Sequence, residues 1–110
     1  MRKTAHIPSK EIAEIAALGL ELRQKHHKGG TNIGVARARD LKNRKNLSMR
    51  TIKRMYSYFK RHEIDKKAEN FGNKEKPSAG YVAWLLWGGD PGYKWVKSIV
   101  DKYKTQQNGD

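Results

Sequence analysis

Three titratable side chains, His62, Glu63 and Asp65, stand together near the end of a predicted helix. Two carboxylates beside an imidazole can hold a divalent metal ion, and the histidine can then activate a water molecule for hydrolysis. Their spacing matches no established ligand pattern. In this very basic chain the acids are expected to pair with lysine or arginine, and a histidine suits the negative end of a helix dipole. We therefore predict no catalytic residues, no metal site and no cofactor, and we classify the chain as a non-enzyme.

A second candidate for chemistry is the stretch GTNIG at residues 30–34, at the start of another predicted helix. Free backbone N–H groups at a helix start can bind a phosphate, such as one of a DNA backbone. The stretch lacks the Gly-Lys-Ser/Thr sequence of a nucleotide-binding P-loop, so it predicts no nucleotide cofactor. Capping of the helix by the Thr31 hydroxyl is the simpler interpretation, because threonine commonly serves that purpose.

Aromatic side chains can stack on unpaired bases, as they do in proteins that bind single strands. Five of them stand among aliphatic residues: Tyr81, Trp84, Trp87, Tyr93 and Trp95. That setting favours a place in the core. Tyr56 and Tyr58 lie closer to the basic residues. Tyr56 shares the apolar face of its helix, so Tyr58 is the better candidate for stacking on a base.

The largest concentration of charge lies between Lys28 and Arg61. This window holds eleven basic residues and one acid, Asp40; eleven minus one leaves ten of the chain's thirteen net positive charges. Repulsion on this scale destabilises a compact domain, and a polyanionic partner would relieve it. Two interpretations are a solvated basic face that keeps the protein soluble and a face that binds nucleic acid. We predict the second.

One helix in this window carries its charges in a stripe. The members of the stripe follow the spacing i, i+4, i+7 and i+11: Arg50, Arg54, Ser57 and Arg61. Lys53 and Lys60 lie beside them. The opposite face is apolar, with the helical spacing i, i+3, i+4 and i+7: Ile52, Met55, Tyr56 and Phe59. Loss of the stripe should therefore spare the core.

The helix before it, starting at Thr31 or Asn32, is predicted to carry Ile33, Ala36 and Leu41 inward and to leave its basic residues on or near the wet side. It should end at Asn43, because asparagine tolerates the left-handed conformation. Two helices joined by a short polar turn, the second one basic, are compatible with a helix-turn-helix pair. The small residue usual in such a turn is absent, and many helical hairpins bind nothing.

Length, composition and periodicity indicate one all-α domain of about five short helices. With 110 residues the chain suits a single small domain. Serine caps are predicted at Ser9, Ser48 and Ser78, and Asp90 is predicted to cap the last helix. The helix that follows Ser78 is hydrophobic on nearly all sides, which predicts the central core element. We predict a flexible segment over residues 1–8, a helical domain over 9–103 and a polar tail over 104–110.

Composition also bears on location. The chain has no cysteine, so it offers no disulfide and no thiolate. It has no apolar run long enough to span a membrane and no hydrophobic segment of a signal peptide at its start. These features predict a soluble intracellular protein without a membrane partner.

Three segments resemble a small module common in tailed-bacteriophage proteins, where it occurs alone or joined to larger proteins: GGTNIGVARARDLKN, TIKRMYSYFKRHEIDK and PSAGYVAWLLWGGDPGYKW. The resemblance covers the chain from the first helix to about Val100. It implies a phage origin, hence the host cytoplasm, with packaging in the virion as an alternative location. It implies no particular activity and no catalytic residues.

We predict a phage protein that binds nucleic acid, duplex DNA before RNA, mainly through phosphates. The alternative is an interaction module that docks on an acidic host or phage protein. The predicted nucleic-acid-binding residues are ten basic side chains and one serine: Arg37, Arg39, Lys42, Arg44, Lys45, Arg50, Lys53, Arg54, Ser57, Lys60 and Arg61.

Overall fold

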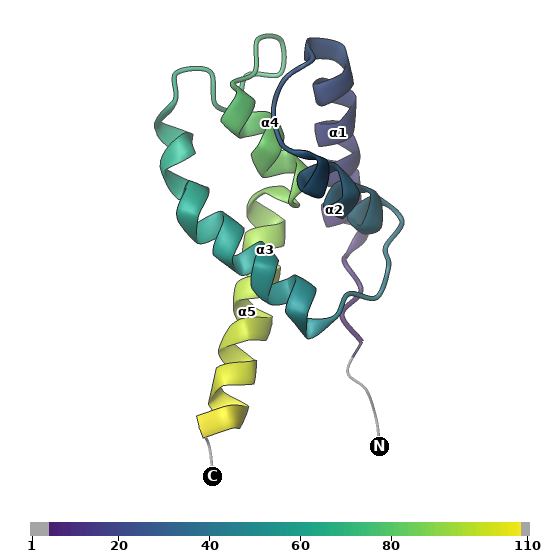
Figure 1. The fold of residues 1–110 in the computed structure, drawn as a ribbon, viewed down its shortest axis with the longest axis vertical. Coiled ribbons are helices and arrows are strands. Elements are labelled where there is room, and N and C mark those ends of the chain that lie inside the picture. The colour runs from purple at the N-terminus through teal and green to yellow at the C-terminus, as the bar shows by residue number, and fades with distance from the viewer. Residues whose placement is uncertain (1–4, 109–110) are drawn as a thin grey trace.

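The structure is a computed structural model that describes residues 5–108, and it is built from helices (Figure 1). The elements are α1 (Lys10–His26), α2 (Asn32–Lys42), α3 (Met49–His62), the short 3-10 helix η1 (Glu63–Lys67), α4 (Ala79–Leu86) and α5 (Gly89–Asn108). Residues 5–108 contain no strand. The predicted all-α class, with five α-helices in one small domain, is confirmed. None of these helices is both long enough and apolar enough to span a bilayer.

Hydroxyl side chains fix where four of the helices begin. Ser9, Thr31, Ser48 and Ser78 each have extended backbone, and each hydroxyl accepts a hydrogen bond from the backbone N–H three residues later. Such a bond satisfies one of the free N–H groups in the first turn. The predicted capping roles of all four residues are confirmed.

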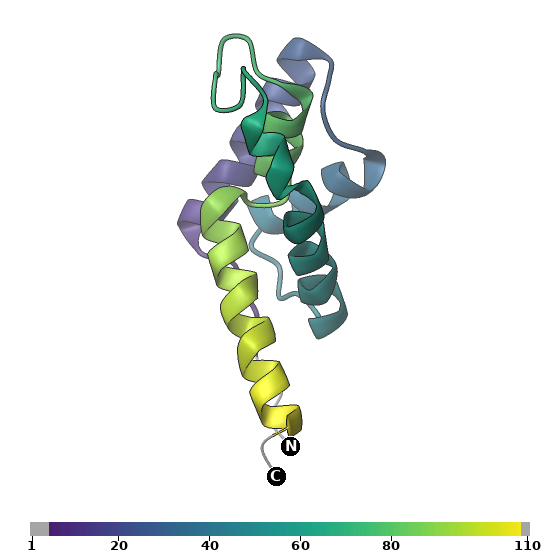
Figure 2. The ribbon, with the colours of Figure 1, turned by 90° about the vertical axis from the view of Figure 1, so that its left-hand side faces the viewer.

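The helices pack in two groups. α1 makes its most extensive contacts with α2 and α4, whereas α3 packs mainly along α5. Figure 2 shows α3 beside α5, and α1 beside α4 above them. Within residues 5–108, α2 and α3 do not pack closely: no pair of their Cα atoms lies within 8 Å, although both helices contribute side chains to the same core. A helix-turn-helix pair requires that packing, so the predicted pair is absent from the described part of the chain.

The core is centred on α4, as its all-round hydrophobicity predicts. Trp84 is 2% exposed, and its ring meets Phe59 of α3 edge-on at 4.8 Å and Tyr93 of α5 at 5.9 Å. The apolar face of α3 contributes three fully buried side chains: Ile52, Met55 and Phe59. Tyr56, predicted on the same face, is half-buried at its edge. α4 therefore joins the two groups of helices.

Gly19 allows α1 and α4 to approach closely. A Cβ atom placed on Gly19 would lie 2.8 Å from the backbone nitrogen of Leu86 and 3.0 Å from the backbone carbon of Leu85. Both distances are shorter than van der Waals contact, and both are to backbone atoms. Only a residue without a side chain fits this crossing.

The inward face of α2 differs from the prediction. Ile33 is 56% exposed and Ala36 is also exposed, whereas Gly34, Ala38 and Leu41 are buried. The reason is again close approach: a Cβ on Gly34 would lie 3.2 Å from Nε1 of Trp87. The predicted inward positions of Ile33 and Ala36 are therefore wrong, whereas that of Leu41, which is fully buried, is confirmed.

The end of α2 falls at Asn43, its C-cap, as predicted, but the left-handed residue is the next one. Asn43 has φ −86° and is not left-handed; Arg44, with φ 51°, takes that conformation. Its guanidinium Nε donates to the carbonyl oxygen of Pro8 at 2.8 Å. At the end of α1, His27 is left-handed, and its backbone N–H donates to the carbonyl oxygen of Arg23. The hydrogen bond from Arg44 to Pro8 offsets the cost of the left-handed backbone at Arg44.

The segment before α1 contacts the loop between α2 and α3. The backbone N–H of Leu47 donates to the carbonyl oxygen of His6 at 2.9 Å, and the His6 N–H donates to the Asn46 side chain at 2.7 Å. Pro8 is buried. Of the segment predicted to be flexible, the structure describes residues 5–8, which are held by these contacts; residues 1–4 lie outside the described residues.

α5 is longer than predicted at both ends. It begins at Gly89, so Asp90 lies within its first turn and is not the N-cap. The Asp90 carboxylate instead accepts from Trp84 Nε1 at 2.9 Å and pairs with Lys66 at 2.8 Å. The helix continues to Asn108, so the predicted tail from Lys104 is helical up to that residue. Residues 109–110 lie outside the described part.

Asp90 should make the fold sensitive to acid. Burial acts to raise its pKa, but the hydrogen bonds from Lys66 and Trp84 outweigh burial and lower it. A lowered folded-state pKa gives stability that is complete above the unfolded-state pKa of about 3.9 and is lost as the pH falls below it. Urea unfolding below pH 4 should show a loss of stability that Asp90→Asn reduces. Equal acid profiles for the two proteins would contradict this role.

Candidate nucleic-acid interface

A groove of about 830 Å³ runs between α3 and α4, and we call it the α3–α4 groove. One wall is α3, and the other is the first part of α4 with the start of α2. Its lining comprises a basic wall and a largely apolar remainder: Gly30, Thr31, Ile33, Arg50, Lys53, Arg54, Ser57, Tyr58, Arg61, His62, Asp65, Ala79, Gly80, Ala83 and Trp87. The groove thus combines cationic and apolar surface.

The arginine stripe of α3 forms the basic wall. Its members are exposed: Arg50, Arg54, Ser57 and Arg61. They are neighbours because residues four apart share one face of a helix. Among the described residues that line the groove, Asp65 is the only acid. The predicted stripe is therefore present as one surface, and it faces a hollow that the sequence does not predict.

The floor of the groove is a column of stacked rings, which we call the stacked column: Trp87, Tyr58 and His62. The rings of Trp87 and Tyr58 are 4.6 Å apart and nearly parallel, and Tyr58 and His62 are 4.5 Å apart. The guanidinium of Arg37 lies 5.8 Å from the centre of the Trp87 ring. These contacts fix the orientation of each ring, so the floor is rigid.

Tyr58 is 5% exposed, so its predicted role as an exposed stacking side chain is wrong. Its ring is covered on both faces by Trp87 and His62. Burial, helped by the charge of Asp65, raises the pKa of its hydroxyl well above the usual value, so the phenol is neutral. The hydroxyl oxygen is buried and has no hydrogen-bond partner among the described residues. An unpartnered buried hydroxyl is costly unless a ligand or water satisfies it.

His62 and Asp65 are brought together at one end of the groove. Nδ1 of His62 lies 3.2 Å from the Asp65 carboxylate, so the partner of Asp65 is this histidine and not the lysine or arginine that the sequence predicts. Glu63 is exposed. Across residues 5–108 no cluster of three potential metal ligands occurs. The pair orients the imidazole at the end of the stacked column.

A second hollow of about 740 Å³ adjoins the first at Gly30. Its basic lining residues come from α1, the following turn and α2: Arg23, His27, Lys28 and Arg39. Arg23 Nε donates to the carbonyl oxygen of Gly29 at 2.9 Å, which holds the turn. Arg39, one of the predicted nucleic-acid-binding residues, thus lies beside Arg23 and Lys28, two basic residues that were not predicted to bind.

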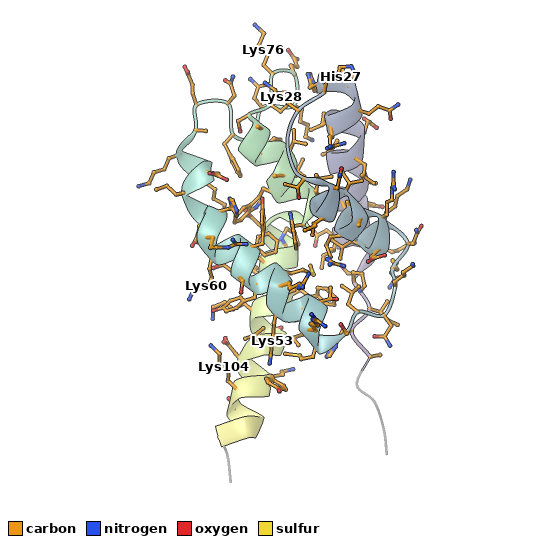
Figure 3. The ribbon with its side chains drawn as sticks, viewed as in Figure 1. His27, Lys28, Lys53, Lys60, Lys76 and Lys104 are labelled. Carbon is orange, nitrogen blue, oxygen red and sulfur yellow. The ribbon has the colours of Figure 1, made fainter. Side chains whose placement is uncertain are left out.

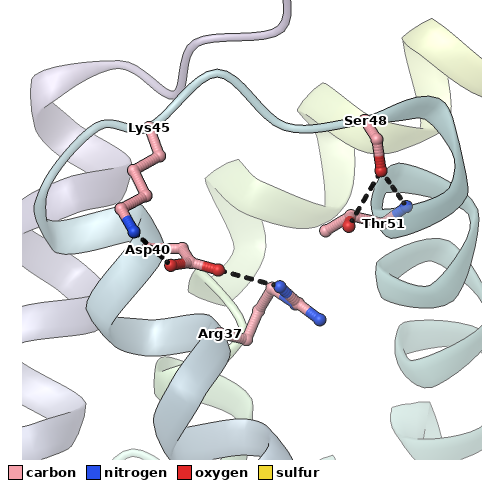
Figure 4. Close-up of polar contacts among 5 residues, drawn as sticks. All are labelled: Arg37, Asp40, Lys45, Ser48 and Thr51. Carbon is pink, nitrogen blue, oxygen red and sulfur yellow. Dashed lines mark hydrogen bonds and ion pairs between the residues drawn. The ribbon is translucent and has the colours of Figure 1, made fainter.

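Three of the predicted binding residues make contacts within the fold. Arg37 donates to Asp40 at 3.0 Å and its side chain is 12% exposed, and Lys45 pairs with the same acid at 3.6 Å (Figure 4). Arg44 is held by Pro8. The expected position of Arg37 on the wet side of α2 is therefore wrong, because the neighbouring Trp87 ring and Asp40 draw it inward. Lys42 is exposed at the end of α2.

Lys60 lies away from the groove, on the side of α3 that meets α5. Its ammonium is 5.5 Å from the Tyr56 ring, and Lys104 of α5 reaches the same ring at 5.8 Å. Lys53 lines the groove, but its ammonium lies 4.2 Å from the Tyr103 ring. Figure 3 shows Lys53 and Lys60 on α3 and Lys104 on α5. These lysines extend positive charge from the stripe toward α5.

The apolar side of the groove was not predicted from the sequence. It is made of small or exposed residues: Ile33, Ala79, Gly80 and Ala83. Gly80 is tightly packed, since a Cβ there would lie 2.9 Å from Cβ of Asp65. The sequence does contain an indication of this surface: Ala79, Gly80 and Ala83 are small residues in a helix that otherwise carries valine, leucine and tryptophan.

Comparison of the chain with protein-family models, curated proteins and solved structures finds no match.

Proposed function

We propose that the protein binds nucleic acid through phosphate contacts made by the arginine stripe. The observation that carries the proposal is the exposure of Arg50, Arg54 and Arg61 along one wall of a groove whose described lining contains a single acid. Eleven residues of helix rise about 16 Å. Phosphates of one strand recur about every 3.4 Å along a duplex axis, so the wall spans roughly five of them.

Arginine suits this contact because its planar guanidinium forms paired hydrogen bonds with phosphate oxygens. The lysines beside the stripe and the second hollow extend the positive surface on both sides of it. The expectation of duplex DNA came from the helix-turn-helix interpretation. Since α2 and α3 do not pack as such a pair, that interpretation no longer supports a duplex over a single strand.

Binding should weaken steeply with salt. If about five phosphates are contacted, log K should fall against log salt with a slope between about −3 and −5, the steeper value for a duplex. Arg50→Ala with Arg54→Ala should weaken binding to all sequences and flatten the slope by about one to two, because two phosphate contacts are lost. Fluorescence anisotropy with labelled oligonucleotides over a salt series measures both quantities.

The matched control is Lys10→Ala with Lys102→Ala, which removes the same charge from exposed positions outside both hollows. The control should keep nearly the parental slope. If it weakens binding as much as the stripe variant does, net charge and not the stripe is responsible. If nucleic acid does not bind at all and an acidic protein from the host does, the alternative of protein docking replaces the proposal.

A further inference from the structure

The α3–α4 groove presents two different chemistries to one ligand. Its α3 wall ends in guanidinium groups, and its floor and opposite wall are largely apolar, apart from His62 and Asp65 at one end. A volume of about 830 Å³ lies within the range of ligand pockets, roughly 300–1,000 Å³. A matching ligand therefore carries negative charge on one side and a flat, weakly polar group on the other.

His62 is the part of the floor that is open to such a group. Tyr58 covers one face of its ring and Asp65 holds its Nδ1 edge, while 41% of the side chain stays exposed. Because the His62 ring is already held in place, it loses little further conformational freedom when another ring stacks on it. Histidine is among the side chains on which unpaired bases stack.

Polar groups are distributed unevenly along the groove. Arg50 and Arg54 lie at one end, where the described lining holds no acid, whereas at the other end Asp65 lies beside His62 and offsets the charge of Arg61. A phosphate is repelled by Asp65, whereas the amino and imino groups of a base can donate to a carboxylate. The unpartnered hydroxyl of Tyr58 lies under the same end. The charges therefore orient a nucleotide with its phosphate toward Arg50 and its base toward His62.

We infer that the groove binds single-stranded nucleic acid. An unstacked base lies on His62 and the apolar floor, and the backbone phosphates contact the arginine stripe. This inference rests on the proposed function and specifies the form of its ligand. A duplex presents phosphates outward and keeps its bases stacked, so it can reach the arginines but cannot fill the floor. A single strand can do both, as other single-strand binders combine a basic groove with a stacking ring.

The first test compares three labelled probes of equal length at one salt concentration: oligothymidylate, oligouridylate and a DNA duplex. Stacking of one base is expected to make both single strands bind roughly 5- to 150-fold tighter than the duplex. A preference between the first two probes would distinguish DNA from RNA. Equal affinity for the single strands and the duplex would overturn the inference and leave the phosphate contacts standing.

The second test removes the stacking ring. His62→Ala should lower affinity for the single strands by roughly 5- to 150-fold and change duplex affinity by less than about twofold. His62→Phe should keep single-strand affinity, because it retains a ring in the same place. Circular dichroism should show that both variants are folded. If His62→Ala binds oligothymidylate as the parent does, the base does not stack on His62 and the inference fails.

The third test does not depend on His62. Ile33→Ala removes apolar surface at the rim of the groove and should weaken single-strand binding by about two- to tenfold. Ile64→Ala is its control, because Ile64 is exposed to a similar degree, 65% against 56%, and lies outside the groove lining. If both variants changed single-strand affinity equally, the strand would not contact Ile33 and would bind outside the groove. If no nucleic acid binds and polyglutamate does, both the inference and the proposed function are wrong.

Discussion

Replacing Trp84 with alanine should lower the free energy of unfolding by about 3–5 kcal/mol, which is a large part of the roughly 5–15 kcal/mol that holds a native domain together. The indole is 2% exposed and contacts rings from α3 and α5, so its loss leaves a cavity between both groups of helices. It also removes the Nε1 donor from Asp90. Urea unfolding followed by far-ultraviolet circular dichroism measures the change.

Trp95→Ala is the matched control for this prediction. Trp95 lies on α5 and is only half-buried, so the same change of side chain there removes less packing. It should cost clearly less than Trp84→Ala. A Trp84→Ala protein that unfolds at the parental urea concentration would mean that α4 is not the centre of the core.

Gly19→Ala should destabilise the protein although alanine is the better helix former. Alanine in place of glycine gains about 1 kcal/mol within a helix. The new Cβ, however, would meet the backbone of α4 at 2.8 Å, and the two helices must move apart. Overpacking costs about 1–3 kcal/mol, with the upper part of that range expected for a clash with backbone. The net effect should be a loss of about 2 kcal/mol.

Gln24→Ala provides the comparison within the same helix, because Gln24 is exposed. It should leave the urea midpoint nearly unchanged. A thermal or urea midpoint for Gly19→Ala at or above that of the parent would show that the crossing of α1 and α4 can widen without cost.

Features that depend on nearby residues were predictable from the sequence. The hydroxyl caps at Ser9, Ser48 and Ser78 act on amides three residues away, so sequence order alone specifies them. The same holds for the buried face of α3, where Ile52 and Phe59 share one side of a regular helix. The spacing of the arginine stripe also follows from helical geometry.

Features that depend on a partner far along the chain were not predictable. Arg37 has the periodicity of an exposed residue, but Trp87, fifty positions later, lies where the guanidinium can cover its ring. Asp90 has the position of a helix cap, but Lys66 and Trp84 offer its carboxylate stronger partners. In both cases a tertiary contact outweighed a local preference that is worth only about 1 kcal/mol.

The groove was missed for a related reason. Periodicity ranks residues by hydrophobicity, and it therefore placed Ile33 inside and treated α4 as buried on all sides. Residue size matters as well: glycine lets helices approach at Gly19 and Gly34, and where no helix approaches, as at Ala79 and Ala83, small residues leave a hollow. Tyr58 was placed outside because its neighbours are charged, yet its ring turns toward Trp87.

The division into two groups of helices has a consequence for motion. α1, α2 and α4 form one packed unit and α3 with α5 forms the other, and such units are where local opening and amide exchange begin. The α3–α4 groove has one wall in each unit. A strand held across it opposes their separation, by about 2.7 kcal/mol when its concentration is a hundred times its dissociation constant. Amide protons of both α3 and α5 would then exchange more slowly, although of these two helices the ligand touches only α3.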